Sequence, residues 1–67
     1  MTTIVLNGEN KIIDSDTTIE RLLLSLSLEN KRLAVEINQE IIPRSLFNNH
    51  ILKELDQVEI VQAIGGG

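Results

Sequence analysis

The chain has 67 residues with ten acidic and six basic side chains, a formal charge of −4, one aromatic ring and no cysteine. A chain of this length buries only about 60% of its unfolded surface, so we expect one small domain and no large enzyme with its own cleft. The composition excludes a disulfide framework, a zinc knuckle and a thiol nucleophile. It also argues against nucleic acid as a partner, because phosphate binding requires a basic surface and base stacking requires aromatic rings.

The N-terminal residues show no targeting signal. They contain no basic leader followed by an apolar run, and no segment of the chain approaches the roughly 20 apolar residues that span a bilayer. We therefore expect no membrane partner and a location in the cytoplasm, with the stroma of a plastid as the alternative compartment.

The first predicted element is a β-hairpin. Residues 3–6 are β-branched and apolar and lead directly into Asn7-Gly8. This dipeptide favours the positive φ angles of a two-residue hairpin turn. A returning strand is therefore expected around residues 11–13.

An amphipathic helix is predicted after the hairpin. Thr17 and Glu20 have the capping-box spacing, which indicates a helix that begins near Thr18. The periodicity fails near residues 28–30, where we expect the helix to end. Its apolar face, which repeats at helical spacing, comprises Ile19, Leu22, Leu23 and Leu26.

The second half of the chain predicts three more strands. Pro43 cannot donate to a β-ladder, so the middle strand is short or lies at an edge. Between Arg44 and Leu55 the only expected feature is a short helical turn near residues 45–47. The expected strand ranges are 33–37, 40–43 and 58–64.

This order of elements favours an α+β fold in which one main helix packs across one face of a small mixed sheet. A right-handed crossover brings the strand after the helix back into the sheet. That is the β-grasp arrangement of ubiquitin-like domains, and this fold places the first and last strands side by side in the middle of the sheet. We expect residues 1–64 to form the domain and residues 65–67 to form a flexible glycine tail.

Gly65, Gly66 and Gly67 directly follow the last predicted strand. Polyglycine has no side chain to bury and loses much backbone freedom on ordering, so it does not stabilise a fold. One interpretation is a frayed terminus. The other is a tail that enters a partner's channel too narrow for a Cβ, in which Gly65 and Gly66 provide clearance and the carboxylate of Gly67 reaches a reactive centre.

The chemistry of a terminal carboxylate suits activation by a partner. An α-carboxylate is ionised at neutral pH and attacks a nucleotide phosphorus without a general base of its own, but it is a poor acyl electrophile. A partner that holds ATP and a divalent cation would convert it to an acyl-adenylate, from which a sulfur nucleophile displaces AMP. The product would be a thiocarboxylate. The chain is then no enzyme: it has no catalytic residue, metal or stably bound cofactor of its own and serves as a substrate.

Several segments together form a pattern that covers the whole chain. They are Asn38-Gln39-Glu40-Ile41-Ile42-Pro43-Arg44, Phe47, His50, Asp56-Gln57-Val58-Glu59-Ile60 and Gly65-Gly66-Gly67. With the length of the chain, they resemble the ThiS family, the sulfur carrier proteins of thiamine biosynthesis. Two departures from the family are Leu55-Asp56, where Gly-Asp is usual, and Phe47, where tryptophan is frequent.

The resemblance implies three partners and a reaction at Gly67. An E1-like enzyme of the ThiF type would adenylate Gly67, a sulfur-donor protein would convert it to 1-thioglycine, and thiazole synthase of the ThiG type would receive the sulfur. Two related functions use the same kind of tail, namely the small subunit of molybdopterin synthase and a ubiquitin-like protein modifier. A binding module with incidental glycines is the alternative from another class.

Alternation along the last strand predicts a small apolar patch on the open face of the sheet. Val58, Ile60 and Ile64 are expected to face the helix, and Val61 and Ala63 to face away from it. Such a patch is either a set of ordinary exposed aliphatic side chains or a docking surface, which we favour. The residues expected to contact a partner are Val5, Val61, Ala63 and Ile64.

Three further side chains have expected roles. Phe47, the only ring, is expected to fill a gap in the core. Arg44 is expected either to pair with an acidic group of the domain or to contact the adenylating partner. His50 has no evident acid or nucleophile as a partner, so we expect a surface or capping residue rather than a general base.

Overall fold

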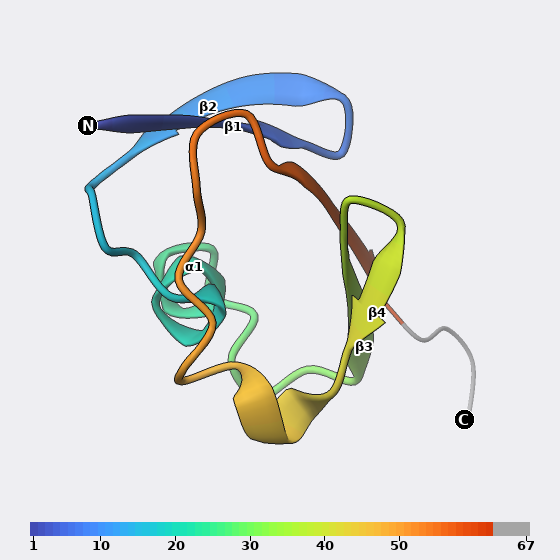
Figure 1. Ribbon diagram of the computed structural model, residues 1–67. Coiled ribbons are helices and arrows are strands. Elements are labelled where there is room, and N and C mark those ends of the chain that lie inside the picture. Colours follow the sequence, from blue (N-terminus) through green and yellow to red (C-terminus); the bar gives the residue numbers. More distant parts are fainter. Residues whose placement is uncertain (63–67) are drawn as a thin grey trace.

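The computed structural model describes residues 1–62, and its elements follow the predicted order (Figure 1). They are β1 (Thr2–Leu6), β2 (Glu9–Ile13), α1 (Ile19–Ser25), β3 (Leu33–Ile37), β4 (Glu40–Ile42), the 3₁₀ turn η1 (Arg44–Leu46) and β5 (Gln57–Gln62). The predicted tail, residues 65–67, and the last two residues of the predicted last strand lie outside the described residues.

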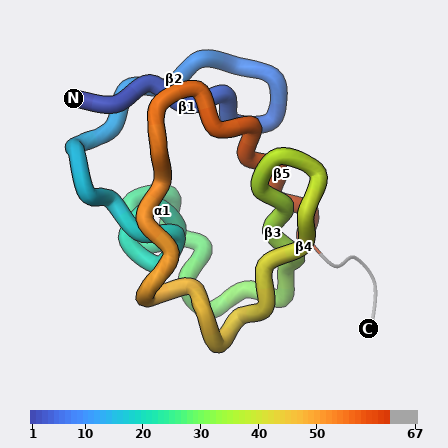
Figure 2. The backbone as a smooth tube through the Cα atoms, viewed as in Figure 1, coloured from blue at the N-terminus to red at the C-terminus, as the bar shows by residue number. Residues whose placement is uncertain are grey.

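The strands form one mixed sheet in the order β2-β1-β5-β3-β4. β1 and β5 are parallel neighbours at its centre, whereas the pairs β1–β2, β3–β4 and β3–β5 are antiparallel. Helix α1 lies across one face, and the chain from η1 to β5 passes beside it (Figures 1 and 2). This confirms the predicted β-grasp architecture, including the central position of the first and last strands.

Two tight turns close the two hairpins of the sheet. Asn7 and Gly8 have φ angles of 49° and 86°, and Asn38 and Gln39 have φ angles of 53° and 71°. Positive φ at both central residues is the geometry that matches the twist of antiparallel strands. The second hairpin ends in β4, which lies at an edge of the sheet, as Pro43 led us to expect.

The N-terminus of α1 is capped by Thr18 rather than by Thr17. The Thr18 hydroxyl accepts a hydrogen bond from the backbone N–H of Arg21 at 3.2 Å. Thr17 instead donates its hydroxyl to the carbonyl oxygen of Asp14 at 2.6 Å. The predicted capping box of Thr17 and Glu20 is therefore wrong, because Thr17 has an acceptor in the preceding turn and the helix begins one residue later.

The remaining free N–H groups of the helix are satisfied from a distant part of the chain. Ile19 donates to the carbonyl of His50 at 3.1 Å and Glu20 donates to the carbonyl of Phe47 at 3.0 Å. With the Thr18 cap, all of the first three helical N–H groups have acceptors, which a helix end otherwise leaves to water. The backbone of His50 thus has the capping role that the sequence left open.

The helix ends earlier than expected, in a Schellman motif at Ser27. Ser27 has a φ of 60° and donates its N–H to the carbonyl of Leu24 at 3.0 Å, while Leu28 donates to the carbonyl of Leu23 at 2.8 Å. This left-handed position is usually glycine. A serine there gives no signal in the sequence, so the end was predicted too late, near residues 28–30.

The core lies between α1 and the sheet. Phe47, with 6% of its surface exposed, is part of it, which confirms the prediction for this ring. The partly buried Leu26 and Leu28 pack against its margin. The buried residues are Ile4, Ile13, Ile19, Leu22, Leu23, Val35, Ile37, Ile42, Phe47, Leu52 and Val58.

The capping assignment makes a prediction. Replacing Thr18→Ala removes the acceptor for the Arg21 N–H and should lower the free energy of unfolding by about 1 kcal/mol, as for other N-caps. Thr18→Ser keeps the hydroxyl and serves as the matched control. Urea unfolding, with hydrogen exchange at the Arg21 amide, measures both effects. Faster exchange at Arg21 in Thr17→Ala than in Thr18→Ala would contradict the assignment.

Candidate functional site

The candidate site is the end of β5, and its position is set first by Asn7. The last paired residues of β1 and β5 are Leu6 and Val58, and after Leu6 the chain turns away into the hairpin. The Asn7 side chain continues the ladder, because its Oδ1 accepts from the N–H of Ile60 at 2.9 Å and its Nδ2 lies 3.5 Å from the Ile60 carbonyl oxygen. The side-chain amide of Asn7 therefore makes the hydrogen bonds to β5 that the backbone of one more residue of β1 would make.

A second asparagine fixes the beginning of β5 from the other side. Asn38 Oδ1 accepts from the N–H of Gln57 at 2.9 Å, and its Nδ2 donates to Asp56 Oδ1 at 3.0 Å. The other oxygen of Asp56 accepts from the backbone N–H of Lys53 at 2.8 Å. The two turns therefore hold the backbone of β5 from both sides through side-chain hydrogen bonds.

The open face of the sheet carries the predicted docking residue Val61. Val58 is buried, Ile60 is partly buried against the core, and Val61 is 58% exposed, so the predicted alternation is confirmed for these residues. Val61 lies opposite Ala34 of β3. Two other predicted docking residues, Ala63 and Ile64, lie outside the described residues.

The structure separates Val5 from Val61. Val5 is half-buried and pairs with Gln57, at the opposite end of β5. Glu59 lies between Gln57 and Val61 on the same face, because side chains alternate along a strand. Along β5, an acidic position therefore separates Gln57 from Val61. The exposed Ile12 of β2 and Ile41 of β4 lie on the same face of the sheet.

Glu59 stands directly opposite Glu36 of β3. Like charges in this arrangement destabilise a sheet. No local signal in the sequence shows this pairing, because the register between two distant strands decides it. The centre of the open face is thus acidic.

A basic hollow lies where β5 ends. It has a volume of about 410 Å³ and is lined by Arg32, Leu33, Ala34, Arg44, Val61 and Gln62. Arg44 donates from Nη2 to the carbonyl oxygen of Lys31 at 3.0 Å, and its guanidinium lies 5.7 Å from the centre of the Phe47 ring. Among the described residues, Arg44 thus donates to a neutral carbonyl. It does not pair there with an acidic group, which was one of the two roles expected from the sequence.

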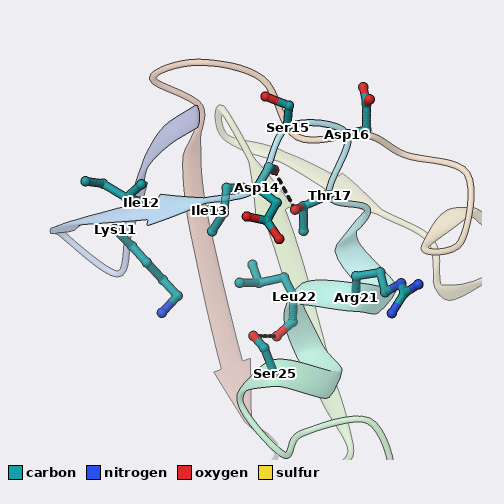
Figure 3. Close-up of a pocket in the computed structure, with 10 residues that line it drawn as sticks. All are labelled: Lys11, Ile12, Ile13, Asp14, Ser15, Asp16, Thr17, Arg21, Leu22 and Ser25. Carbon is teal, nitrogen blue, oxygen red and sulfur yellow. Dashed lines mark hydrogen bonds between the residues drawn. The ribbon is translucent and has the colours of Figure 1, made fainter. Parts of the chain in front are cut away.

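A second hollow, of about 540 Å³, lies between β2, the β2–α1 connection and α1. Figure 3 shows that the charged ends of Lys11 and Arg21 point in different directions and do not meet over a common centre. Its hydrogen bonds, from Thr17 to Asp14 and from Ser25 to Leu22, are local to the backbone. The hollow is separated from β5 by β1 and has no arrangement of a nucleophile with a base.

Two further searches cover the described residues. Among residues 1–62, no three His, Cys, Asp or Glu side chains are grouped so that they could hold a metal ion. In the same part of the chain, no helix has the length and apolarity needed to cross a membrane.

The fold accommodates both departures from the family pattern, one in the turn before β5 and one in the core. Leu55 has a φ of 67°, the left-handed conformation that favours glycine, and its side chain is 62% exposed. Its N–H donates to the carbonyl of Thr3 at 2.6 Å, which ties the turn to β1. Phe47 is buried in the core. The backbone therefore keeps a glycine-type turn although the residue is leucine.

Comparisons with known proteins agree on one family. The sequence model of the ThiS family matches residues 4–67. The sulfur carrier protein ThiS of Bacillus subtilis is 44% identical over 63 residues, which cover 92% of this chain and 96% of that protein. A crystal structure of a thiamine biosynthesis protein (ThiS) from Geobacter metallireducens has a TM-score of 0.82 and 28% identity, and covers 98% of this chain and 100% of that one.

A longer protein also contains a similar segment. Thiazole synthase of Paramagnetospirillum magneticum is 39% identical to this chain over 64 residues, which are 96% of this chain. The chain spans about one fifth of the length of the thiazole synthases that it matches, 20% and 19% for the two compared.

The strained turn before β5 makes a prediction. Leu55→Gly removes a left-handed leucine and should raise the free energy of unfolding by about 1 kcal/mol, since left-handed backbone costs a residue with a Cβ about that much. Leu55→Ala is the matched control, because it removes the same exposed side chain and keeps the Cβ. Thermal or urea unfolding compares the three chains. An equal gain in Leu55→Ala would attribute the effect to the side chain instead.

Proposed function

This chain belongs to the ThiS family, and from that premise we propose that it is a sulfur carrier of thiamine biosynthesis whose reactive group is the carboxylate of Gly67. The observation that carries the proposal is the extent of the family match, which runs over residues 4–67 and so includes the three glycines after β5. The domain acts as a substrate and not as a catalyst.

The proposed chemistry has two steps. A carboxylate oxygen of Gly67 attacks the α-phosphorus of ATP, so that an O–P bond forms and pyrophosphate leaves. A sulfide nucleophile then attacks the carbonyl carbon of the adenylate, the bond to AMP breaks, and a thiocarboxylate remains. ATP and a divalent cation belong to the adenylating partner, where the cation offsets the charge on the phosphates.

The proposed partners are an E1-like adenylating enzyme of the ThiF type, a sulfur-donor protein and thiazole synthase of the ThiG type. The similarity of this chain to a segment of proteins named thiazole synthase supports the last of them, because a carrier-like segment and the named activity occur in one protein there. We propose that these partners meet the carrier in the cytoplasm, or in the stroma if the chain belongs to a plastid.

The open face beside the end of β5 is the proposed docking surface. Val61 is its exposed aliphatic residue on the described part of β5, and Ala63 and Ile64 follow it in the sequence. Val5 is a secondary candidate, because Glu59 separates it from Val61.

The proposal predicts a change of mass at Gly67. After incubation with the adenylating enzyme, ATP, magnesium and sulfide, the intact mass should show one oxygen replaced by sulfur. Deleting Gly67, or adding one alanine after it, should slow adenylation by about 10²-fold, because misplacing a reacting group by even about 1 Å costs that much. Unfolding measurements on both variants control for the fold.

Two outcomes would contradict the carrier function. Adenylation of the deletion variant at the rate of the original chain would show that Gly67 is not the reactive residue. High-molecular-weight conjugates on a denaturing gel, without sulfur at the chain end, would indicate a protein modifier. Transfer of the sulfur to a molybdopterin precursor and not to thiazole synthase would assign the chain to the other carrier class.

The docking surface makes a separate prediction. Val61→Asp places a charge on the apolar position beside the end of β5 and should raise the KM of the adenylating enzyme for the carrier by about tenfold. Ile12→Asp is the matched control, because Ile12 is 65% exposed on β2, the edge strand separated from β5 by β1. An equal rise in KM for Ile12→Asp would show that Val61 has no special contact.

A further inference from the structure

The basic hollow at the end of β5 has no role in the function described so far. Arg32 directly precedes β3, and Arg44 begins η1, so the two residues come from separate segments. Both line the hollow that also contains Val61 and Gln62. Gln62 pairs with Leu33 and is the point from which the chain continues to Gly67. The two arginines therefore flank the base of the tail.

We propose that Arg32 and Arg44 form a docking site for carboxylate side chains on the adenylating partner, an inference that rests on the proposed carrier function. The charge distribution supports an acidic occupant. The chain has a formal charge of −4 and only six basic residues, yet two of the six line this hollow, and its lining among residues 1–62 includes no carboxylate. The centre of the same sheet, with Glu36 opposite Glu59, has the opposite sign.

Arg44 is held in place before a partner arrives. Its Nη2 donates to the Lys31 carbonyl at 3.0 Å, and its guanidinium lies over the Phe47 ring at 5.7 Å. A guanidinium has five N–H donors in a planar fork that matches a carboxylate with two parallel hydrogen bonds. Because the fork is already positioned, less side-chain freedom is lost when a carboxylate binds.

The geometry favours a protein carboxylate over the phosphates of ATP. Five residues separate Gln62 from the end of Gly67. A tail threaded into a channel in extended form spans about 17 Å over that length. The nucleotide meets the far end of the tail, whereas the arginines stand at its base. They would face the mouth of the channel on the partner's surface.

The test compares two charge reversals. Arg32→Glu and Lys11→Glu change the net charge equally, but Lys11 lies on β2, away from the hollow. We expect Arg32→Glu to raise the KM for the carrier in ATP–pyrophosphate exchange by about tenfold, with kcat and the KM for ATP unchanged, and Lys11→Glu to change it little. High salt should reduce the difference between the two variants.

Arg44→Gln is a second variant, in which a neutral amide replaces the guanidinium. It should also raise the KM for the carrier, and urea unfolding measures any loss of stability caused by removing the contacts of Arg44 with Lys31 and Phe47. Arg32 is exposed, so Arg32→Glu still tests the proposal if Arg44→Gln is destabilised.

Each contrary outcome has a distinct meaning. Equal effects of Arg32→Glu and Lys11→Glu would show general electrostatic steering and overturn the site, as would no effect of either. A change in the KM for ATP would assign the arginines to the nucleotide instead. If the original chain itself supports no pyrophosphate exchange, the carrier function fails and the inference fails with it.

Discussion

The architecture depends on how the last strand is held between two turns. β5 lies at the centre of the sheet, but the backbone pairing between β1 and β5 ends at Leu6. Asn7 and Asn38, each in a turn with positive φ, add side-chain hydrogen bonds to the backbone of β5 from both neighbours. Each such bond contributes about 1 kcal/mol.

The segment between β4 and β5 links the helix to that strand. Carbonyl groups of Phe47 and His50 accept the first N–H groups of α1, and Leu55 then brings the chain back beside β1 in a left-handed turn. The ring of Phe47 fills the core on one side and supports Arg44 on the other. One short irregular segment thus caps the helix, contributes Phe47 to the core and positions Arg44 at the basic hollow.

Local signals in the sequence predicted most of the fold. Asn7-Gly8, the apolar runs of the strands, the alternation in β5 and Pro43 each act through a few neighbouring residues, so β1 to β4 and the beginning of β5 were placed to within a residue or two. Signals failed at both ends of α1: its N-terminus takes acceptors from the distant Phe47 and His50, and its end has a serine in a position usual for glycine. The Glu36–Glu59 pair and the hollow of Arg32 and Arg44 could not be predicted, because both require the register of β3 with β5 or a contact between distant segments.

The pairing of β1 with β5 has a consequence for how the domain folds. The two strands at the centre of the sheet come from opposite ends of the described chain, so the contacts that complete the core have a high sequence separation and close a long loop. Chains of this kind fold more slowly than those with local contacts. During synthesis the sheet has a gap at its centre until β5 has left the ribosome, and the hairpin of β1 and β2 cannot meet β3 before then. Of the described elements, the strand that completes the centre of the sheet is therefore the last to be made.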